Sequence, residues 1–402
     1  MNNLKVLYCT YDGLLDPLGQ SQILPYMYKF KKFVSQLHII SFEKKKLYND
    51  RKNLLKNLNE KKINWNYLRF NKRYFFLGKI LDSFKIFFYI IYFIIFKKIN
   101  IIHSRGYFPL IFIIFVKKYL NIKIIFDMRG FWIDEKKDCG ALNMNNFIHR
   151  IIYNFLKYVE KKLIINSDKI IVLTKRSKSE LINKFYIKNK YIFVIPCCAD
   201  FDFFKRLTNS EKKEQRKKLN INSRNHVICY LGSLGTWYML EQMINFFDYL
   251  SLTKQNLNFL IITNDINEKL KKLTIEKNKN NINKIILINT KRKELPNLLG
   301  CADVTISFIK PYFSKIASSP TKYAESLAMG IPVISNHGVG DIDEITKKLN
   351  AGQLIDPYNF KTFSKKSFEK IINLDGNNLR LKSQKMLSLD FAINEYKKVY
   401  NL

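Results

Sequence analysis

Short apolar runs of the kind that form buried strands alternate with longer helical stretches along almost the whole chain. In the first half these runs are 4–10, 36–42, 100–104, 122–128, 169–174 and 192–196, and in the second half they are 226–232, 258–263, 284–290, 302–308, 332–336 and 352–355. Such alternation is typical of parallel sheets that helices cover on both faces. We therefore predict an α/β fold, with ligands bound beyond the carboxyl ends of the strands.

The alternation pauses between Ala199 and Arg224, where the segment is polar and highly charged. A chain of 402 residues is long enough for two domains. We predict two Rossmann-like, doubly wound domains facing a central cleft, one over residues 1–203 and the other over residues 204–385. The amphipathic stretch 386–402 predicts a C-terminal helix that packs back on the first domain.

The composition is strongly basic, with 69 Lys and Arg against 33 Asp and Glu and a net charge of +36. Such a surplus suits nucleic acid, anionic lipid or anionic small substrates. The abundance of Lys, Asn, Ile, Phe and Tyr is equally the bias of an AT-rich genome, so drift in composition explains the charge as well as function does. No nucleic-acid-binding module is recognisable, and a basic nucleic-acid-binding protein is the least favoured interpretation.

The six cysteines lie mostly in or beside apolar runs, and none has metal-ligand spacing. The start, MNNLKVLYCT, is typical of a first strand rather than of a targeting segment. We therefore expect a protein of the reducing cytoplasm.

Two apolar runs are too short for a membrane span, which needs about 20 residues. Ile86–Phe96 is flanked by Lys85 and by Lys97 and Lys98, and the run 108–116 is interrupted by a proline. Each run suits a buried helix, and apolar runs flanked by lysines also suit a helix that lies in a membrane interface. Together with residues 70–76 they motivate the hypothesis of peripheral contact with an anionic membrane, on the inner face of the cytoplasmic membrane.

The segment KIASSPTKYAESLAMGIPV, which starts at Lys315, carries the clearest chemical signal. Ser319 as cap and Pro320 as first residue predict the start of a helix, and Gly330 predicts its end. The run Pro332–Ser335 then predicts a strand.

The same helix start suits a phosphate, because helix N-termini offer free N–H groups and a partial positive charge. The hydroxyls of Ser318, Ser319 and Thr321 and the cation of Lys322 add to this. Glu325, one turn further along, is placed to accept the hydroxyls of a ribose. An ordinary capped helix with an exposed Lys and Glu would show the same pattern.

The stretch SSPTKYAESLAMGIPV resembles the donor-binding signature of retaining glycosyltransferases of family 4, which have the GT-B fold of two Rossmann-like domains. The family's Glu and its Ala-x-Gly-x-Pro-Val pattern are matched by Glu325, Ala328, Gly330, Pro332 and Val333. The resemblance extends over nearly the whole chain, through VIPCCAD, YLGSLGTWYMLEQMINFF and CADVTIS.

This resemblance implies transfer of a hexosyl or N-acetylhexosaminyl group from a UDP- or GDP-linked nucleotide sugar to a glycan or lipid-linked acceptor. The pathway would be the synthesis of a bacterial cell-surface polysaccharide: capsule, O-antigen or glycolipid. Glu325 would bind the nucleotide ribose, and neither a metal nor another cofactor would be required. The leaving phosphate would take the acceptor proton, so no covalent carboxylate is assigned, and the protein would position the reactants and stabilise charge.

The sequence departs from the family pattern in two places, and the second concerns the pair that grips the donor diphosphate. The family's earlier Glu is Ala317 here, and the usual Arg and Lys that follow Gly232 are Ser233 and Tyr238. We predict that Gly232 and Ser233 still border the donor. We also predict that Lys322, with Ser318 and Ser319, takes over the phosphate. Lys310 and Lys315 are weaker substitutes, because nothing in the sequence fixes their direction.

The first strand leads into the loop TYDGLLDPLGQSQ. By resemblance to the glycine-bearing first loop of the family, Gly19 would let the backbone approach the donor diphosphate, and Gln20 would contact the sugar or the acceptor. A plain strand-to-helix turn explains the same residues.

The segment FDMRGFWIDE resembles an Asp-x-Arg-Asp-x-Trp element of the family, with Asp127, Arg129 and Trp132 matching and Gly130 in place of the second Asp. Asp127 and Arg129 are the predicted catalytic pair. A loop cap in which Arg129 simply pairs with Asp127 explains them equally well. The predicted acceptor-side residues, which follow this strand and its neighbour, are His103, Arg105, Trp132, Asp134 and Glu135.

A second interpretation keeps the fold and changes the reaction. Nucleotide-sugar 2-epimerases share this architecture, although they resemble the 315–345 segment less. Sugar transfer is therefore the favoured prediction.

Overall fold

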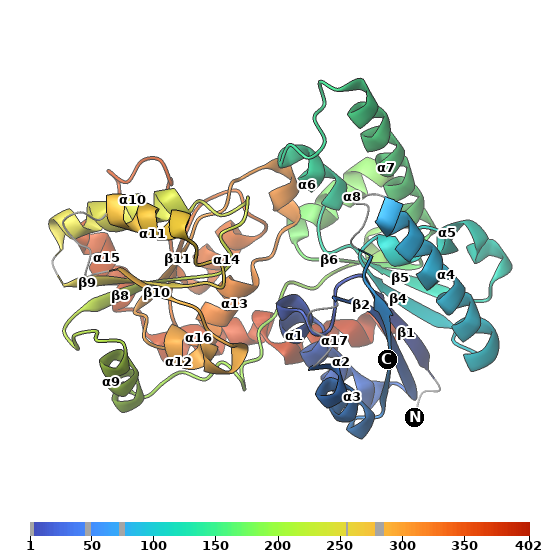
Figure 1. The fold of residues 1–402 in the computed structure, drawn as a ribbon, viewed down its shortest axis with the longest axis horizontal. Helices are drawn as coiled ribbons and strands as arrows, with labels where there is room; N and C mark the ends of the chain where they lie inside the picture. Colours follow the sequence, from blue (N-terminus) through green and yellow to red (C-terminus); the bar gives the residue numbers. More distant parts are fainter. Residues whose placement is uncertain (1–3, 45–49, 72–76, 255, 278–284) are drawn as a thin grey trace. The chain divides into compact units, whose positions relative to one another are not determined.

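The computed structural model describes residues 4–44, 50–71, 77–254, 256–277 and 285–402 (Figure 1). The chain divides into two compact units. Residues 1–196 and 392–402 form the first unit, and residues 197–391 form the second.

The first unit is built on a seven-stranded parallel sheet of order β3-β2-β1-β4-β5-β6-β7. The order reverses between β1 and β4, which makes the ends of these strands the topological switch point where doubly wound sheets bind ligands. The strands are β1 (Lys5–Thr10), β2 (Gln36–Glu43), β3 (Ile63–Arg69), β4 (Ile101–Arg105), β5 (Lys123–Asp127), β6 (Lys169–Val172) and β7 (Ile192–Val194).

Helices cover both faces of this sheet. Right-handed crossovers place the helices that precede β2 and β3 on one face and those that follow β3 on the other, as Figure 1 shows for α2 and α3 against α4, α5 and α7. The helices are α1 (Pro17–Gln22), α2 (Leu24–Phe30), α3 (Arg51–Glu60), α4 (Leu77–Lys97), α5 (Ile113–Val116), α6 (Trp132–Asp138), α7 (Phe147–Asn166) and α8 (Lys175–Phe185). Short 3-10 turns are η1 (Lys31–Phe33), η3 (Phe108–Leu110), η4 (Lys117–Tyr119) and η5 (Asn189–Tyr191).

The second unit has a six-stranded parallel sheet of order β10-β9-β8-β11-β12-β13. Its strands are β8 (His226–Leu231), β9 (Leu257–Ile262), β10 (Ile285–Ile288), β11 (Val304–Ser307), β12 (Val333–Ser335) and β13 (Gly352–Leu354). Its helices are α9 (Asn209–Lys218), α10 (Leu240–Thr253), α11 (Glu268–Lys277), α12 (Leu295–Leu299), α13 (Thr321–Ala328), α14 (Ile342–Leu349), α15 (Lys365–Ile372) and α16 (Gly376–Leu387), with 3-10 turns η7 (Arg292–Glu294) and η8 (Phe313–Ala317).

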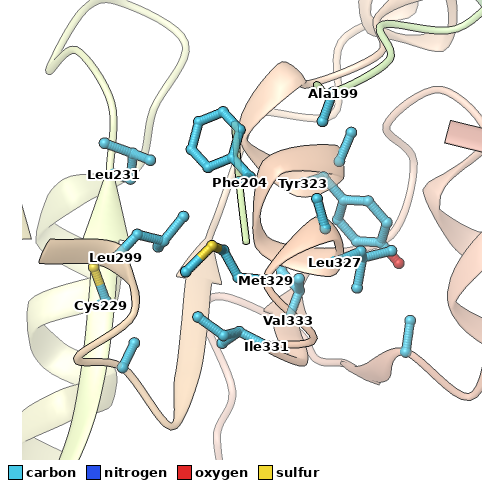
Figure 2. Close-up of a cluster of buried hydrophobic side chains, with 14 of the residues drawn as sticks. Ala199, Phe204, Cys229, Leu231, Leu299, Tyr323, Leu327, Met329, Ile331 and Val333 are labelled. Carbon is cyan, nitrogen blue, oxygen red and sulfur yellow. The ribbon is translucent and has the colours of Figure 1, made fainter. Parts of the chain in front are cut away.

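The core of the second unit fixes α13 against the sheet. Figure 2 shows Tyr323 and Leu327 of this helix among the buried side chains that surround Phe204 and Val333. Arg380 of α16 donates to the carbonyl of Ala328 at the end of α13, and it also donates to the carbonyl of Phe204 at 2.6 Å. The helix that bears the predicted donor residues is therefore held on its inner side and at its end.

The C-terminal helix α17 (Leu389–Tyr400) begins in the second unit and continues into the first. Within the first unit, the ring of Tyr396 meets that of Phe30 edge-on at 5.7 Å between centroids, and the ring of Tyr400 lies 4.6 Å from Phe30. The Tyr400 hydroxyl also hydrogen-bonds His103 Nδ1 at 2.7 Å. The predicted return of this helix to the first domain is confirmed.

The predicted α/β class and the parallel sheets are confirmed as well, and each predicted strand run overlaps an observed strand. The strand that the sequence patterns missed is β3. It lies at the edge of the first sheet, and only Ile63, Trp65 and Leu68 of its residues are buried. An edge strand with so few apolar residues lacks the continuous apolar run by which the central strands were predicted.

The hydrogen bond between Tyr400 and His103 gives a first prediction. Removing the hydroxyl in Tyr400→Phe leaves a buried ring nitrogen without its partner, which should lower the free energy of unfolding by about 1–3 kcal/mol. Urea denaturation measures this change. Tyr186→Phe is the control, because Tyr186 is 90% exposed. Equal stability of the two variants would contradict the prediction.

Candidate functional site

The helix α13 begins one residue later than the sequence predicted. Pro320 is its N-cap, Thr321 is its first residue, and the cap makes no side-chain hydrogen bond. The prediction that Ser319 caps the helix is therefore wrong. The Ser319 hydroxyl instead accepts a hydrogen bond from the backbone N–H of Cys197 at 3.0 Å, which ties the helix start to the first residues of the second unit.

The end of α13 is as predicted. Gly330 follows the last turn with φ of +67°, a left-handed conformation that favours glycine. A Cβ atom at this position would also lie 2.3 Å from the carbonyl oxygen of Gly376, so a side chain cannot be accommodated. The strand β12 begins shortly after, which completes the predicted helix-to-strand unit.

Glu325 is 1% exposed, and two cations approach its carboxylate. Lys322 Nζ lies 3.0 Å from one oxygen, and an Arg292 guanidinium nitrogen lies 3.5 Å from the other. A buried carboxylate needs such partners to offset its loss of hydration. More than a quarter of each cation's side-chain surface is exposed. A ligand that contacts these cations would therefore lie next to the Glu325 carboxylate.

Arg292 was not predicted from the sequence. It lies in η7, in the connection after β10, and its guanidinium group lies over the ring of Phe203 at 5.0 Å. Its segment reads KRKELP, one of many basic stretches in the chain. Only the fold distinguishes this arginine from its neighbours.

A lysine and a tryptophan meet beside the loop that follows β8. Lys315 Nζ lies 3.6 Å from the centre of the Trp237 ring, a cation–π contact, and the side chain is buried. The backbone of Lys315 is held too, because its carbonyl accepts the N–H of Gly340 at 2.8 Å. The direction of Lys315, which the sequence left open, is thus set by Trp237.

The predicted donor residues Gly232 and Ser233 open the same loop. The Gly232 N–H bonds the carbonyl of Ile262 at 3.1 Å, and the Ser233 carbonyl accepts the Tyr230 hydroxyl at 2.5 Å. The next residue, Leu234, donates its N–H to Asp265 at 2.8 Å. Backbone and carboxylate contacts therefore fix the first turn of this loop.

In the first unit, Asp127 ends β5 next to Arg105 of β4 in the sheet register. Its buried carboxylate has His103 Nε2 at 3.7 Å, Arg105 at 3.9 Å and Arg129 at 3.6 Å. These distances exceed those of direct hydrogen bonds, so the charges interact mainly electrostatically. Burial by itself would raise the pKa of Asp127, but Arg129, His103 and Arg105 hold it below its usual value. Asp127 is therefore ionised at neutral pH.

His103 is enclosed between Asp127 and α17. Burial lowers the pKa of His103, which keeps the ring neutral. The anionic carboxylate faces Nε2 and favours the proton there, so Nδ1 accepts the hydrogen bond from the Tyr400 hydroxyl. His103 thus links Asp127 to the C-terminal helix from inside the protein.

Arg105 is bonded to the first loop, which follows β1. The Arg105 guanidinium bonds Asp12 at 3.3 Å. A Cβ atom on Gly19 would lie 2.1 Å from the Gly13 carbonyl oxygen, and Gln20 donates to the Leu14 carbonyl at 3.0 Å. The close backbone approach at Gly19 and the hydrogen bond of Gln20 therefore keep the first loop compact.

Glu43, which the sequence did not single out, anchors this loop from β2. Its buried carboxylate accepts the N–H groups of Leu14 at 2.7 Å and Leu15 at 3.2 Å, and the Ser41 hydroxyl at 2.6 Å. Burial raises the pKa of Glu43 while these hydrogen bonds oppose the rise. No motif indicated this role, because β2 supplies Glu43 from a distant part of the sequence.

The remaining predicted acceptor-side residues lie in α6. Asp134 is buried and binds the Tyr153 hydroxyl at 2.7 Å and Lys157 at 2.9 Å, so it ties α6 to α7. The ring of Trp132 meets Phe108 edge-on at 5.0 Å. Glu135 is half-buried in the first turn of the helix. The structure thus clusters Asp127, Arg129, His103 and Arg105, while Asp134 is engaged elsewhere in the unit.

Two family models match the chain. Residues 211–385 match the model described as glycosyl transferases group 1, and residues 36–203 match the model described as glycosyltransferase family 4. The chain is a group 1 glycosyltransferase. No curated protein sequence matches the chain.

Solved structures show that this glycosyltransferase has the predicted GT-B fold. A glycosyltransferase from Rickettsia africae is 17% identical with a TM-score of 0.65, covering 100% of this chain and 98% of its own. Anabaena HepE in complex with UDP and glucose is 12% identical with a TM-score of 0.71, covering 99% and 100%. The lipopolysaccharide outer core galactosyltransferase WaaB is 12% identical with a TM-score of 0.65, covering 99% of both chains.

The described part of this glycosyltransferase contains no group of His, Cys, Asp and Glu side chains arranged to hold a metal ion. The absence of a metal requirement stays a prediction.

The burial of His103 predicts how stability depends on pH. The pKa of His103 is lower in the folded state than in the unfolded state. As the pH falls through about 6.5, the unfolded chain therefore binds a proton at this residue while the folded chain does not. Stability should then decline by at most about 1.4 kcal/mol per pH unit for this group. In His103→Gln, urea denaturation at pH 7.5 and 5.5 should show a smaller loss than in the wild type. His149→Gln is the control, and an unchanged loss in His103→Gln would refute the assignment.

Proposed function

We propose that this group 1 glycosyltransferase retains the configuration of a hexosyl or N-acetylhexosaminyl group, as in family 4. The group would pass from a UDP- or GDP-linked donor to a glycan or lipid-linked acceptor in cell-surface polysaccharide synthesis on the cytoplasmic side of the membrane. The observation that carries the proposal is the buried Glu325, whose carboxylate lies one turn into α13. HepE, of the same fold, has been seen with UDP and with UDP-glucose.

The donor nucleotide would bind with its ribose on Glu325. Two ribose hydroxyls can donate to the two carboxylate oxygens, and Lys322 can then turn from Glu325 to a phosphate. The N–H groups at the start of α13 and the hydroxyls of Ser318 and Ser319 would bind the same diphosphate. As the bond to the sugar breaks, these groups would stabilise the negative charge on the leaving diphosphate.

Asp127 would act through its neighbours rather than on the sugar itself. Its side chain is fully buried, whereas 15% of the Arg129 side chain is exposed. A carboxylate without solvent access is a poor candidate for covalent attack, so a role in orienting Arg129 and His103 fits it better. The leaving phosphate would take the acceptor proton, with Arg129 as the member of this cluster that reaches a bound substrate.

The epimerase alternative predicts a different dependence on the acceptor. A thermal-shift screen against nucleotide diphosphates and nucleotide sugars would first identify the donor, because a ligand that binds the folded state raises its stability. Release of nucleotide diphosphate from that donor should then require an added glycan or lipid-linked acceptor. Release without any acceptor, together with an epimerised sugar, would overturn the proposal.

The ribose contact predicts a loss of nucleotide affinity in Glu325→Gln. Replacing two charge-assisted hydrogen bonds by neutral ones should weaken binding of UDP or GDP about tenfold or more. Isothermal titration calorimetry measures the change, and circular dichroism checks that the variant folds. Glu344→Gln on α14, an exposed glutamate, serves as the control. Unaltered affinity in Glu325→Gln would remove Glu325 from the site.

The phosphate contact predicts a selective loss in Lys322→Ala. Affinity for the nucleoside diphosphate should fall about tenfold, while affinity for the parent nucleoside should change little, because the lost attraction acts on phosphate charge. Lys348→Ala, an exposed lysine of α14, is the control. If Lys315→Ala instead shows the selective loss and Lys322→Ala does not, the phosphate lies beside Trp237.

A further inference from the structure

The helix α4 is apolar on both of its faces. The predicted run Ile86–Phe96 falls within it, and Ile86, Ile90 and Phe93 are buried against the sheet. The opposite face carries a stripe of exposed side chains at helical spacing: Leu81, Phe84, Phe88, Tyr92 and Ile95. Packing against the sheet explains the first set and leaves the second unexplained. Residues 72–76, which precede the helix and belong to the run that first suggested a membrane, lie outside the described residues.

The helix α7 repeats this arrangement. Val159, Leu163 and Ile164 are buried. Its outer side carries a second stripe of exposed side chains at helical spacing: Ile148, Ile151, Phe155, Tyr158 and Ile165. Phe88 is 65% exposed and Phe155 is 59% exposed, so these rings do not lie at the edge of a buried core.

The two stripes belong to one layer of the first unit. Both helices cover the same face of the first sheet (Figure 1). The turn η3 contacts α4, and α5 contacts both η3 and α7. Phe84 stacks on Phe112 at 3.9 Å between ring centroids, and exposed Phe115 and Tyr119 continue the apolar surface. We call the exposed side chains of α4, α7 and residues 112–119 the α4–α7 face.

The exposed charged side chains of α4 and α7 are positive. Exposed lysines lie on both helices, among them Lys85, Lys97, Lys161 and Lys162. The acidic residues within the bounds of α4 and α7 are Asp82 and Glu160, and both are buried. An apolar surface bordered by cations complements an anionic surface with an apolar interior.

We propose that the α4–α7 face docks on the surface of an anionic phospholipid bilayer. The apolar stripes would enter the boundary between head groups and acyl chains, and the lysines would bind lipid phosphates while their stems stay apolar. None of the described helices is long and apolar enough to cross a membrane. Docking would bring the first unit to a lipid-linked acceptor. Only this consequence of docking rests on the proposed function.

The charge pattern favours lipid over a second copy of this chain. In a symmetric dimer through this face, each patch would meet its own copy and set lysines against lysines. Such repulsion is unfavourable once the surfaces lose water. An anionic bilayer satisfies the same lysines without this cost.

Vesicle flotation tests the proposal with the full chain. The wild type should float with phosphatidylglycerol vesicles at low salt and much less with phosphatidylcholine vesicles, and salt should weaken the binding. The double variant Phe88→Ser and Phe155→Ser should bind phosphatidylglycerol at least about tenfold more weakly, because each change removes apolar surface from the interface. Both positions are exposed, so the fold is preserved.

The matched control carries Leu252→Ser and Leu381→Ser, two changes on the second unit at positions 86% and 62% exposed. This control should float like the wild type. The proposal is overturned if the wild type stays in solution, if the α4–α7 variant floats like the control, or if the face proves to mediate a dimer that the variant dissociates without any lipid binding. Each variant should bind UDP and GDP as tightly as the wild type, which a separate titration measures. A variant that loses membrane binding but keeps nucleotide binding therefore tests the docking surface and not the donor site.

Discussion

In both units a parallel sheet places the carboxyl ends of neighbouring strands side by side, and each candidate site depends on this constraint. Arg105 and Asp127 end adjacent strands of the first sheet, and the His103 ring comes from the same strand as Arg105. In the second unit, the loop after β8 meets the segment before α13, which brings Trp237 to Lys315. Residues far apart in the sequence therefore share a site because strand order, not chain order, sets their neighbours.

Each unit buries one carboxylate among cations at this edge. Asp127 has two guanidinium groups and an imidazole near it, and Glu325 has Lys322 and Arg292. Burying a carboxylate is unfavourable unless such partners compensate. The partners differ in their exposure: the side chains of Arg292 and Lys322 are 27% and 30% exposed, whereas those beside Asp127 are at most 15% exposed. His103 is also bonded to Tyr400 of α17. The first arrangement suits ligand exchange, and the second suits fixed geometry.

The sequence predicted the features that local chemistry decides. Buried strands leave apolar runs, Gly330 has the left-handed conformation that its place after a helix requires, and the place of Glu325 one turn into α13 follows from helix spacing. It failed where distant partners decide. Ser319 bonds Cys197 instead of capping α13, and Lys315 is directed by Trp237. Arg292, from the connection after β10, lies 3.5 Å from Glu325. The edge strand β3 was missed because few of its side chains are buried.

The same distinction applies to the excess of positive charge, which composition alone left undecided. Drift toward lysine and isoleucine codons would scatter both residue types without regard to the fold. On α4 and α7, however, the acidic side chains are buried and four of the lysines, Lys85, Lys97, Lys161 and Lys162, are exposed. The exposed apolar residues repeat at helical spacing on one layer of one unit. A random bias has no reason to respect helical periodicity. Whatever produced the composition, the fold has arranged part of it into an amphipathic surface, and that arrangement is what a lipid interface would recognise.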